Sequence, residues 1–334
     1  MKIHITFLTV IVLFLVSSCK QKQAISRLKS WDINEIRIRD PFIIKDADAK
    51  KYYMYAQKGN RMEREEWDRI PGVEVYESSD LRTWYGPVEV FAFSGGFWAD
   101  YQVWAPEVHV YQDKFYLFAT FSSRDTLEAL SPVDFKLPRR GTQVLLADKP
   151  IGPFEPFDNK PHTPWNWSSL DGTLWVEDGI PYMVFCHEWT QIQNGSMELV
   201  QLADDLSKPV TEPVTLFHAG DAEWVRGVSN DGKVTDGCFL YKTKGGQLIM
   251  IWSSFGENQY AIGQAVSENG KVAGPWIQSD LIFNENGGHG MILETFEGEL
   301  LLVFHQPNSS PKERAQFYRL TEVDNRLVLG EKYF

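Results

Sequence analysis

The chain has 334 residues, of which 43% are hydrophobic and 14% aromatic, enough apolar material for a large folded core. Its formal net charge of −12, with no Lys/Arg-rich stripe, argues against a nucleic-acid partner. Three cysteines are too few for a disulfide framework in a chain of this length, so burial must supply the stability.

The N-terminus has the pattern of an export signal followed by a lipid attachment site. Lys2 precedes an apolar run over residues 5–16, and small residues lead directly into Cys19. The run is shorter than the roughly 20 residues of a membrane-spanning helix, so cleavage before Cys19 is favoured over an uncleaved helix. The sequence therefore predicts a signal peptide over residues 1–18, lipidation of Cys19 and a polar tether over residues 19–30. We expect a cell-envelope lipoprotein, periplasmic or surface-facing, that contacts the membrane only through its lipid.

Internal repeats organise the remaining residues, 31–334. Each repeat pairs a strand-like segment that opens on a small or acidic turn with a second, strongly apolar strand. The pairs are 39–43 with 52–55, 104–108 with 115–118, 170–174 with 182–185, 235–239 with 248–251, and 288–292 with 300–303. Turns such as Gly86-Pro87 and Gly152-Pro153 recur with a similar period, so each repeat holds about four strands.

The repeats predict an all-β protein whose single domain is a five-bladed β-propeller, with four-stranded antiparallel blades around a central channel. The segment from Trp31 to Ile38 is the candidate strand that fastens the last blade to the first and removes an exposed sheet edge. Two charged insertions, Arg61–Arg69 and Arg124–Arg139, interrupt the pattern, and we expect helical turns or long rim loops there.

The first strand of each propeller blade lines the channel, so equivalent positions of the repeats should meet at one mouth of it. Matching the repeats places Asp40, Ala105, Asp171, Asp236 and His289 there, at intervals of 65, 66, 65 and 53 residues. One Asp-Gly turn alone needs no functional explanation. Three carboxylates in one narrow site repel each other, however, and such perturbed groups cluster at active sites. The pattern therefore predicts catalysis at this mouth.

The motifs that carry these positions give the chain a resemblance to glycoside hydrolase family 43, the five-bladed group that includes arabinofuranosidases, arabinanases, xylosidases and exo-galactanases. The resemblance runs from about Arg39 to the C-terminus. It rests on Arg39-Asp40-Pro41, Trp104-Ala105-Pro106-Glu107-Val108, Asp171, Thr235-Asp236-Gly237 and Gly288-His289-Gly290. It implies an inverting hydrolase that releases a sugar from a plant-type polysaccharide or oligosaccharide.

The resemblance also implies a role for each aspartate. Asp40 corresponds to the general base that activates water, Asp171 to the residue that holds the acid and tunes its pKa, and Asp236 to the general acid. The family commonly has Glu-Gly where this chain has Asp236-Gly237, and the shorter side chain requires a closer approach to the leaving oxygen. Rival proton donors are Glu107, Glu188 and Glu223.

Substrate contacts are expected from Trp104 and Phe42, which flank axial positions, and from Glu107 if it orients the sugar; core packing is the alternative for the two rings. The resemblance implies that His289 approaches a cation, usually calcium, mostly through water, and the alternative is a channel histidine without a metal. No organic cofactor is expected, and a monomer is predicted.

Two other functions are compatible with the same residues. A non-catalytic glycan-binding lipoprotein would explain the altered acid position as a lost acid. A retaining fructosidase also carries Arg-Asp-Pro, but the Glu-Cys pair of that group is absent. Among the family's sugars arabinofuranose is the first expectation, and attack from the chain end is favoured if the insertions wall off the cleft.

Overall fold

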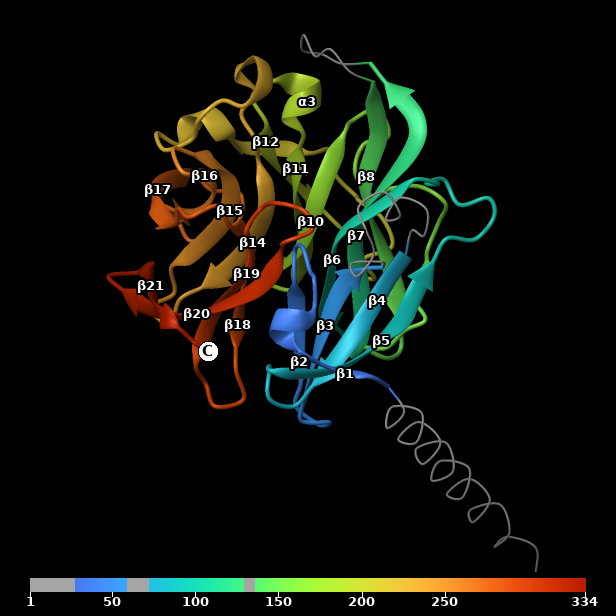
Figure 1. Cartoon of the computed structure of the whole chain (residues 1–334). Helices are drawn as coiled ribbons and strands as arrows, with labels where there is room; N and C mark the ends of the chain where they lie inside the picture. Colours follow the sequence, from blue (N-terminus) through green and yellow to red (C-terminus); the bar gives the residue numbers. More distant parts are fainter. Residues whose placement is uncertain (1–27, 59–71, 129–135) are drawn as a thin grey trace, which may run out of the picture.

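The computed structural model describes residues 28–58, 72–128 and 136–334, which form antiparallel sheets arranged in a ring (Figure 1). The predicted five-bladed β-propeller is confirmed. The signal peptide, Cys19, most of the tether and the insertion Arg61–Arg69 lie outside the described residues. Within the described part, no helix combines the length and apolar character needed to cross a lipid bilayer.

The strands of each blade run in sequence order from the channel outward, except that β1 joins the outer edge of the first blade. The first blade contains β2 (Phe42–Asp46), β3 (Lys51–Gln57), β4 (Gly72–Ser78), β5 (Thr83–Ala92) and β1 (Ser30–Asp32). The second contains β6 (Gln102–Tyr111), β7 (Lys114–Leu127), β8 (Leu137–Ala147) and β9 (Glu155–Pro156). The third contains β10 (Ser169–Glu177), β11 (Ile180–His187), β12 (Ser196–Gln201) and β13 (Val214–His218).

The last two blades follow the same plan. The fourth contains β14 (Asp236–Lys242), β15 (Leu248–Gly256), β16 (Gln259–Ser267) and β17 (Trp276–Phe283). The fifth contains β18 (Gly288–Glu294), β19 (Leu300–Gln306), β20 (Arg314–Val323) and β21 (Arg326–Lys332). Short helical turns connect some strands: η1 (Ile33–Glu35), α3 (Trp189–Ile192), η2 (Ala219–Asp221) and η3 (Ser229–Asp231).

The hydrophobic core is divided among the interfaces between neighbouring blades. Five apolar clusters occur, each built from residues of two adjacent blades, including the pair formed by the fifth and the first. The second strands, such as β3 and β15, are buried on both faces because they lie in the middle of a sheet that packs against a blade on each side. This explains why they appear in the sequence as continuous apolar runs instead of alternating patterns.

Ring closure differs from the prediction that Trp31 to Ile38 forms one strand on the last blade. β1 pairs with β5 of the first blade, and Asp32 then starts η1 by accepting a hydrogen bond from Asn34 N. The rest of the segment contacts the fifth blade without joining its sheet, through an isolated bridge between Arg37 and Arg314 and a 2.8 Å hydrogen bond from Arg314 Nε to Asn34 O. Three buried isoleucines fill the interface between the fifth and first blades, so packing closes the ring: Ile33, Ile36 and Ile38.

The described ends of the second insertion, Arg124–Arg139, continue the strands of the blade. Thr126 of β7 pairs with Pro138 of β8, and Leu127 pairs with Leu137. These ends are therefore strands and not helical turns, and the alternative of a long rim loop falls on residues outside the described ranges.

Candidate active site

The inner strands share a local irregularity at the channel mouth. In β6, β10, β14 and β18 the pairing register shifts across two residues near the start of the strand. One residue at each site adopts a positive φ: Ala105 (42°), Asp171 (56°), Gly237 (50°) and His289 (53°), and Asp40 (51°) takes the same conformation just before β2. A bulge of this kind re-aims a side chain and leaves its N–H outside the strand ladder.

This geometry corrects the sequence matching at one position. The structural equivalent of Asp40, Asp171 and His289 in the fourth blade is Gly237, and Asp236 lies one residue earlier. Glycine is required there because a Cβ on Gly237 would lie 2.7 Å from Cγ of His289. Asp236 still faces the pocket, as do the residues that precede the positive-φ position in the first three blades: Arg39, Trp104 and Leu170.

Side chains from the second strand of the preceding blade lie beside three of these positive-φ residues, whereas the N–H of Gly237 is bound by Asp171 on a first strand. Asp171 N donates to Thr120 Oγ1 at 2.8 Å, and His289 N donates to Ser253 Oγ at 2.8 Å. Nδ1 of His305 in the last blade lies 3.3 Å from Asp40 N and 3.1 Å from Asp40 Oδ1, and this single ring nitrogen can bond to one of the two at a time. Buried N–H groups need such partners, so the second, fourth and fifth blades help to position the turns at Asp171, His289 and Asp40. The sequence analysis missed all three second-strand residues, although they recur at matching positions.

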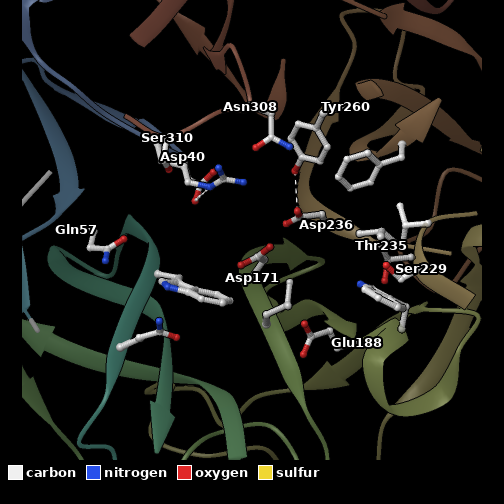
Figure 2. Close-up of a pocket in the computed structure, with 18 of the residues that line it drawn as sticks. Asp40, Gln57, Asp171, Glu188, Ser229, Thr235, Asp236, Tyr260, Asn308 and Ser310 are labelled. Atoms are coloured by element: carbon white, nitrogen blue, oxygen red, sulfur yellow. Dashed lines mark hydrogen bonds and ion pairs between the residues drawn. The ribbon is translucent and has the colours of Figure 1, made fainter. Parts of the chain in front are cut away.

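The three predicted aspartates converge on His289 (Figure 2 labels the aspartates). Nδ1 of His289 lies 3.3 Å from Asp40 Oδ1, 3.8 Å from Asp171 Oδ2 and 3.5 Å from Asp236 Oδ1. Burial alone would lower the pKa of His289, but the charges of the surrounding carboxylates raise it well above its ordinary value. His289 is therefore an imidazolium at neutral pH and compensates the carboxylates that surround it.

Asp40 is held as an anion. Burial would raise its pKa, but the His289 charge, a hydrogen bond with His305 and the Arg39 guanidinium together lower the pKa to about 2. Arg39 is anchored in turn by the fully buried Glu313, at 3.5 Å between Nη1 and Oε1. A carboxylate that is ionised throughout the neutral range, in a pocket open to water, is able to accept a proton from that water.

Asp171 and Asp236 share a proton. Burial and then the Asp236 charge raise the pKa of Asp171 well above its usual range, although Gly237 N donates to Oδ2 of Asp171 at 3.1 Å. Burial would also raise the pKa of Asp236, but hydrogen bonds with Asp171 and His289 lower it. The pair thus holds one proton at neutral pH, in contact with a carboxylate that is 24% exposed to the pocket.

The pocket around these groups has a volume of about 580 Å³ and suits a short stretch of carbohydrate. Aromatic side chains contribute to its wall beside the carboxylates: Tyr101, Trp104, Trp189, Phe255 and Tyr260. Gln57, Ser229, Thr235 and Asn308 add polar groups (Figure 2). A sugar ring has apolar C–H faces and a rim of hydroxyl groups. Aromatic rings next to hydrogen-bonding side chains suit both features.

The family model described as "Glycosyl hydrolases family 43" matches residues 33–325. The chain belongs to glycoside hydrolase family 43. Family 43 enzymes are glycosidases, so the resemblance drawn from the motifs is confirmed at the level of the family. No curated protein matched the chain.

Solved structures agree with the family 43 assignment. The chain is 35% identical to an endo-arabinase from Bacteroides thetaiotaomicron VPI-5482, with a TM-score of 0.78, covering 88% of this chain and 98% of that one. A thermostable family-43 glycoside hydrolase is 23% identical, with a TM-score of 0.70 and coverage of 88% and 92%. An alpha-L-arabinofuranosidase from Lactobacillus brevis is 18% identical, with a TM-score of 0.68 and coverage of 91% and 96%. The latter two similarities concern the fold alone.

The three rival proton donors, Glu107, Glu188 and Glu223, do not share the position of Asp236. Glu188 lines the pocket, but Arg140 Nη1 binds its Oε2 at 2.7 Å and Ser168 Oγ donates to the same oxygen at 2.7 Å. Glu107 is buried behind the channel wall and contacts Nε2 of His109 at 3.0 Å, so it does not line the pocket. Glu223 is exposed and also outside the pocket lining. Among the candidates, Asp236 is the carboxyl closest to the other two aspartates and open to the pocket.

The two aromatic rings expected to stack on the sugar, those of Trp104 and Phe42, lie in different surroundings. Trp104 lines the pocket, with the Arg140 guanidinium 4.0 Å above its ring, so only one face is available to a ligand. Phe42 is 5% exposed and packs in the core between the fifth and first blades, with its ring 5.2 Å from that of His109. The prediction that Phe42 and Glu107 contact substrate therefore conflicts with their positions. Both lie two residues beyond the positive-φ turn, where the strand has already entered the blade.

The site does not fit calcium. Asp171, Asp236 and His289 bring one donor atom each within 4.8 Å of one another, the only such group among residues 28–58, 72–128 and 136–334. Calcium requires six to eight oxygen ligands, whereas an imidazolium offers no lone pair and here neutralises the same carboxylates.

Gly237 offers a test of the turn geometry. Alanine at this position would combine a left-handed backbone with a contact to the His289 ring, and we expect Gly237→Ala to destabilise the protein by about 1–3 kcal/mol and to abolish activity. Gly246→Ala is the matched control, because Gly246 also has a positive φ (88°) but nothing lies within 4 Å of a Cβ there. Thermal unfolding and turnover of both variants check the prediction, which is contradicted if Gly237→Ala keeps the activity of Gly246→Ala.

Proposed function

We propose that this family 43 protein hydrolyses arabinofuranosidic bonds of an arabinan-type polysaccharide with inversion at the anomeric carbon. The observation that supports the reaction is the convergence of Asp40, Asp171 and Asp236 on His289 at a single pocket. The sugar is supported by the 35% identity with a protein named as an endo-arabinase. That relationship also favours cleavage within the chain over the chain-end attack first expected.

In the proposed reaction Asp40 removes a proton from a water molecule as the water oxygen attacks the anomeric carbon. The bond from that carbon to the leaving oxygen breaks, and its electron pair goes to the leaving oxygen, which takes up the proton held by Asp171 and Asp236. Asp171 keeps that proton in place through its contact with Asp236 and through its low exposure of 4%. His289 offsets the negative charge of the three carboxylates throughout the reaction.

The spacing of the two catalytic carboxylates makes product stereochemistry the deciding measurement. Oδ1 of Asp40 and Oδ1 of Asp236 lie 3.3 Å and 3.5 Å from the same nitrogen of His289. Their separation is therefore at or below the lower end of the inverting range of about 6.5–9.5 Å, and a retaining enzyme would have about 5–5.5 Å.

Two experiments test the proposal. Incubation with linear arabinan, arabinoxylan, xylan and arabinogalactan, followed by chromatography of the products, should show release from arabinan above all. Proton NMR of the first turnovers should show the anomer opposite to that of the bond cleaved. Release of the same anomer would make Asp40 a nucleophile, and binding without release from any of these glycans would leave a glycan-binding protein.

We also propose that the protein acts as a monomer tethered to the cell envelope through a lipid on Cys19, as the lipobox pattern indicates. Cys19→Ser should move the protein from the membrane fraction to the soluble fraction while its turnover of soluble arabinan stays the same. The fractions are compared by immunoblotting. Continued membrane association of Cys19→Ser would contradict the anchor.

We infer that the channel functions without calcium, because His289 supplies the positive charge. Prolonged EDTA treatment should leave turnover and the thermal unfolding midpoint unchanged, within error. A loss of either that added calcium restores would support the cation expected from the sequence.

A further inference from the structure

Tyr260 is a pocket residue that none of the sequence motifs indicated. It lies on β16, two strands away from the channel-lining strand of its blade, and its hydroxyl donates to Oδ2 of Asp236 at 2.7 Å (Figure 2). The side chain is 1% exposed overall, yet it lines the pocket. The hydroxyl is thus the polar end of a buried ring, placed at the wall beside the acid.

Three neighbours fix the position of the Tyr260 ring. It stacks on His305, with ring centres 5.7 Å apart, and packs against Phe255 at 5.3 Å. Gly288 leaves room for it, since a Cβ there would collide with the ring. The hydroxyl is therefore positioned by packing before any substrate arrives, which is the condition for rapid proton transfer.

Both oxygens of Asp236 are engaged in the structure. Oδ1 faces Nδ1 of His289 at 3.5 Å, and Oδ2 accepts the Tyr260 hydrogen bond. Asp236 is also one methylene shorter than the glutamate that is common at this position. A direct transfer would require Asp236 to leave Tyr260 and extend toward the leaving oxygen, whereas the Tyr260 hydroxyl contacts the carboxyl and its residue also lines the pocket.

We propose that Tyr260 transfers the proton from Asp236 to the leaving oxygen, so that the aspartate and the tyrosine together replace a longer acid. This inference rests on the proposed hydrolytic function. In the step, the Tyr260 O–H bond breaks as the leaving oxygen gains its proton, and the hydrogen bond between Tyr260 and Oδ2 of Asp236 reverses, so that the proton held by the Asp171–Asp236 pair passes through Oδ2 to the Tyr260 oxygen. Asp236 ends as a carboxylate and Tyr260 ends neutral.

The chemistry of Tyr260 requires the two transfers to be coupled. Burial and the nearby charges of Asp236 and Asp40 raise the pKa of Tyr260 well above its usual value, so the phenolate does not form at neutral pH. Tyr260 can therefore release a proton only while it receives one. Tyr260 therefore carries a proton only when Asp236 supplies one.

Removing the Tyr260 hydroxyl tests the transfer. Tyr260→Phe should lower kcat on arabinan by about 10²–10⁴-fold, the usual contribution of acid catalysis. On a 4-nitrophenyl glycoside of the released sugar or oligosaccharide, whose leaving group needs little protonation, it should lower kcat by less than about tenfold. Tyr55→Phe is the matched control, because Tyr55 is also buried and donates a 2.7 Å hydrogen bond, to Pro150 O, outside the pocket.

A second variant separates proton transfer from a structural role. If Tyr260 carries the proton, adding Asp236→Glu to Tyr260→Phe should recover at least about tenfold of the lost activity, because the longer acid reaches the leaving oxygen directly. Equal losses on both substrates, a loss on arabinan below about threefold, or no recovery in the double variant would each overturn the proposal.

Proton NMR provides a readout that does not depend on turnover. The wild-type protein should show a downfield hydroxyl resonance that disappears in Tyr260→Phe and in Asp236→Asn. Absence of this resonance contradicts the transfer, whichever glycan is cleaved. Its presence in a protein that releases no sugar supports the Tyr260–Asp236 unit and counts against the hydrolytic function alone.

Discussion

Asp40→Asn is expected to lower kcat by about 10²–10⁴-fold on every substrate, including activated aryl glycosides, while the fold is retained. Asparagine has the same shape, but it cannot accept a proton from water. The loss should be independent of leaving-group acidity, because Asp40 acts on the attacking water and not on the departing oxygen. Steady-state kinetics and circular dichroism measure the two quantities.

Chemical rescue makes this prediction specific to the base. Sodium azide should restore turnover of the activated glycoside by Asp40→Asn and give a glycosyl azide of inverted configuration, since the anion needs no base and attacks from the face that water normally uses. Asp148→Asn is a control, because Asp148 pairs with Lys114 on the surface and is 78% exposed. Activity of Asp40→Asn at the level of Asp148→Asn would remove Asp40 from the mechanism.

The repeat pattern was sufficient to predict the propeller because it reflects how the blades are buried. The second strand of each blade packs against both neighbouring blades. Runs such as Leu248 to Ile251 are therefore continuously apolar and recur with the blade period. The same periodicity brought Asp40, Asp171 and His289 to one place. Such agreement is expected wherever symmetry alone determines position.

Matching the repeats by residue type gave the wrong equivalent in the fourth blade, because local backbone geometry determines which positions correspond. Aligning Asp236 with Asp171 paired residues of the same type, but the conformation that must match is the positive φ, which belongs to Gly237. The same bulge explains the misplaced substrate contacts, because it reverses which residues face the channel. Trp104, just before the turn, lines the pocket, whereas Phe42 and Glu107, beyond their turns, are buried within the blades.

Residues supplied by other strands could not be identified from the motifs. Tyr260 reaches Asp236 from β16, and its place depends on tertiary packing against His305 and Phe255. The second-strand residues Thr120 and His305 left a weak signal, as polar residues that end apolar runs at matching positions. Their partners, the N–H groups freed by the bulges, become visible only in three dimensions.

His289→Asn is expected to lower the free energy of unfolding by about 3–5 kcal/mol near pH 6.5, because it removes the positive charge that contacts all three aspartates. Asparagine is chosen because it tolerates the positive φ of this position, 53°. Activity should fall as well, since without the His289 charge the pKa of Asp40 rises and the base loses its negative charge.

The pH dependence of the difference in unfolding free energy between wild type and His289→Asn shows whether the charge of His289 causes it. The pKa of His289 is raised in the folded protein, so its stabilisation is fully present below the unfolded value of about 6.5 and is lost as pH rises through the folded pKa. The difference in unfolding free energy between wild type and His289→Asn should therefore vanish at alkaline pH, where neither protein has a positive charge at residue 289. It should also narrow at acidic pH, where the carboxylates of the variant take up protons.

Urea unfolding of both proteins between pH 4 and pH 9, roughly the range over which these groups titrate, measures the gap directly. His109→Asn is the matched control, because His109 contacts a single carboxylate, that of Glu107, outside the pocket. Its loss should be smaller and should leave turnover unchanged. A gap for His289→Asn that does not vary with pH would mean that His289 contributes packing alone, and the negative charges of Asp40 and of the Asp171–Asp236 pair would then need another positive partner.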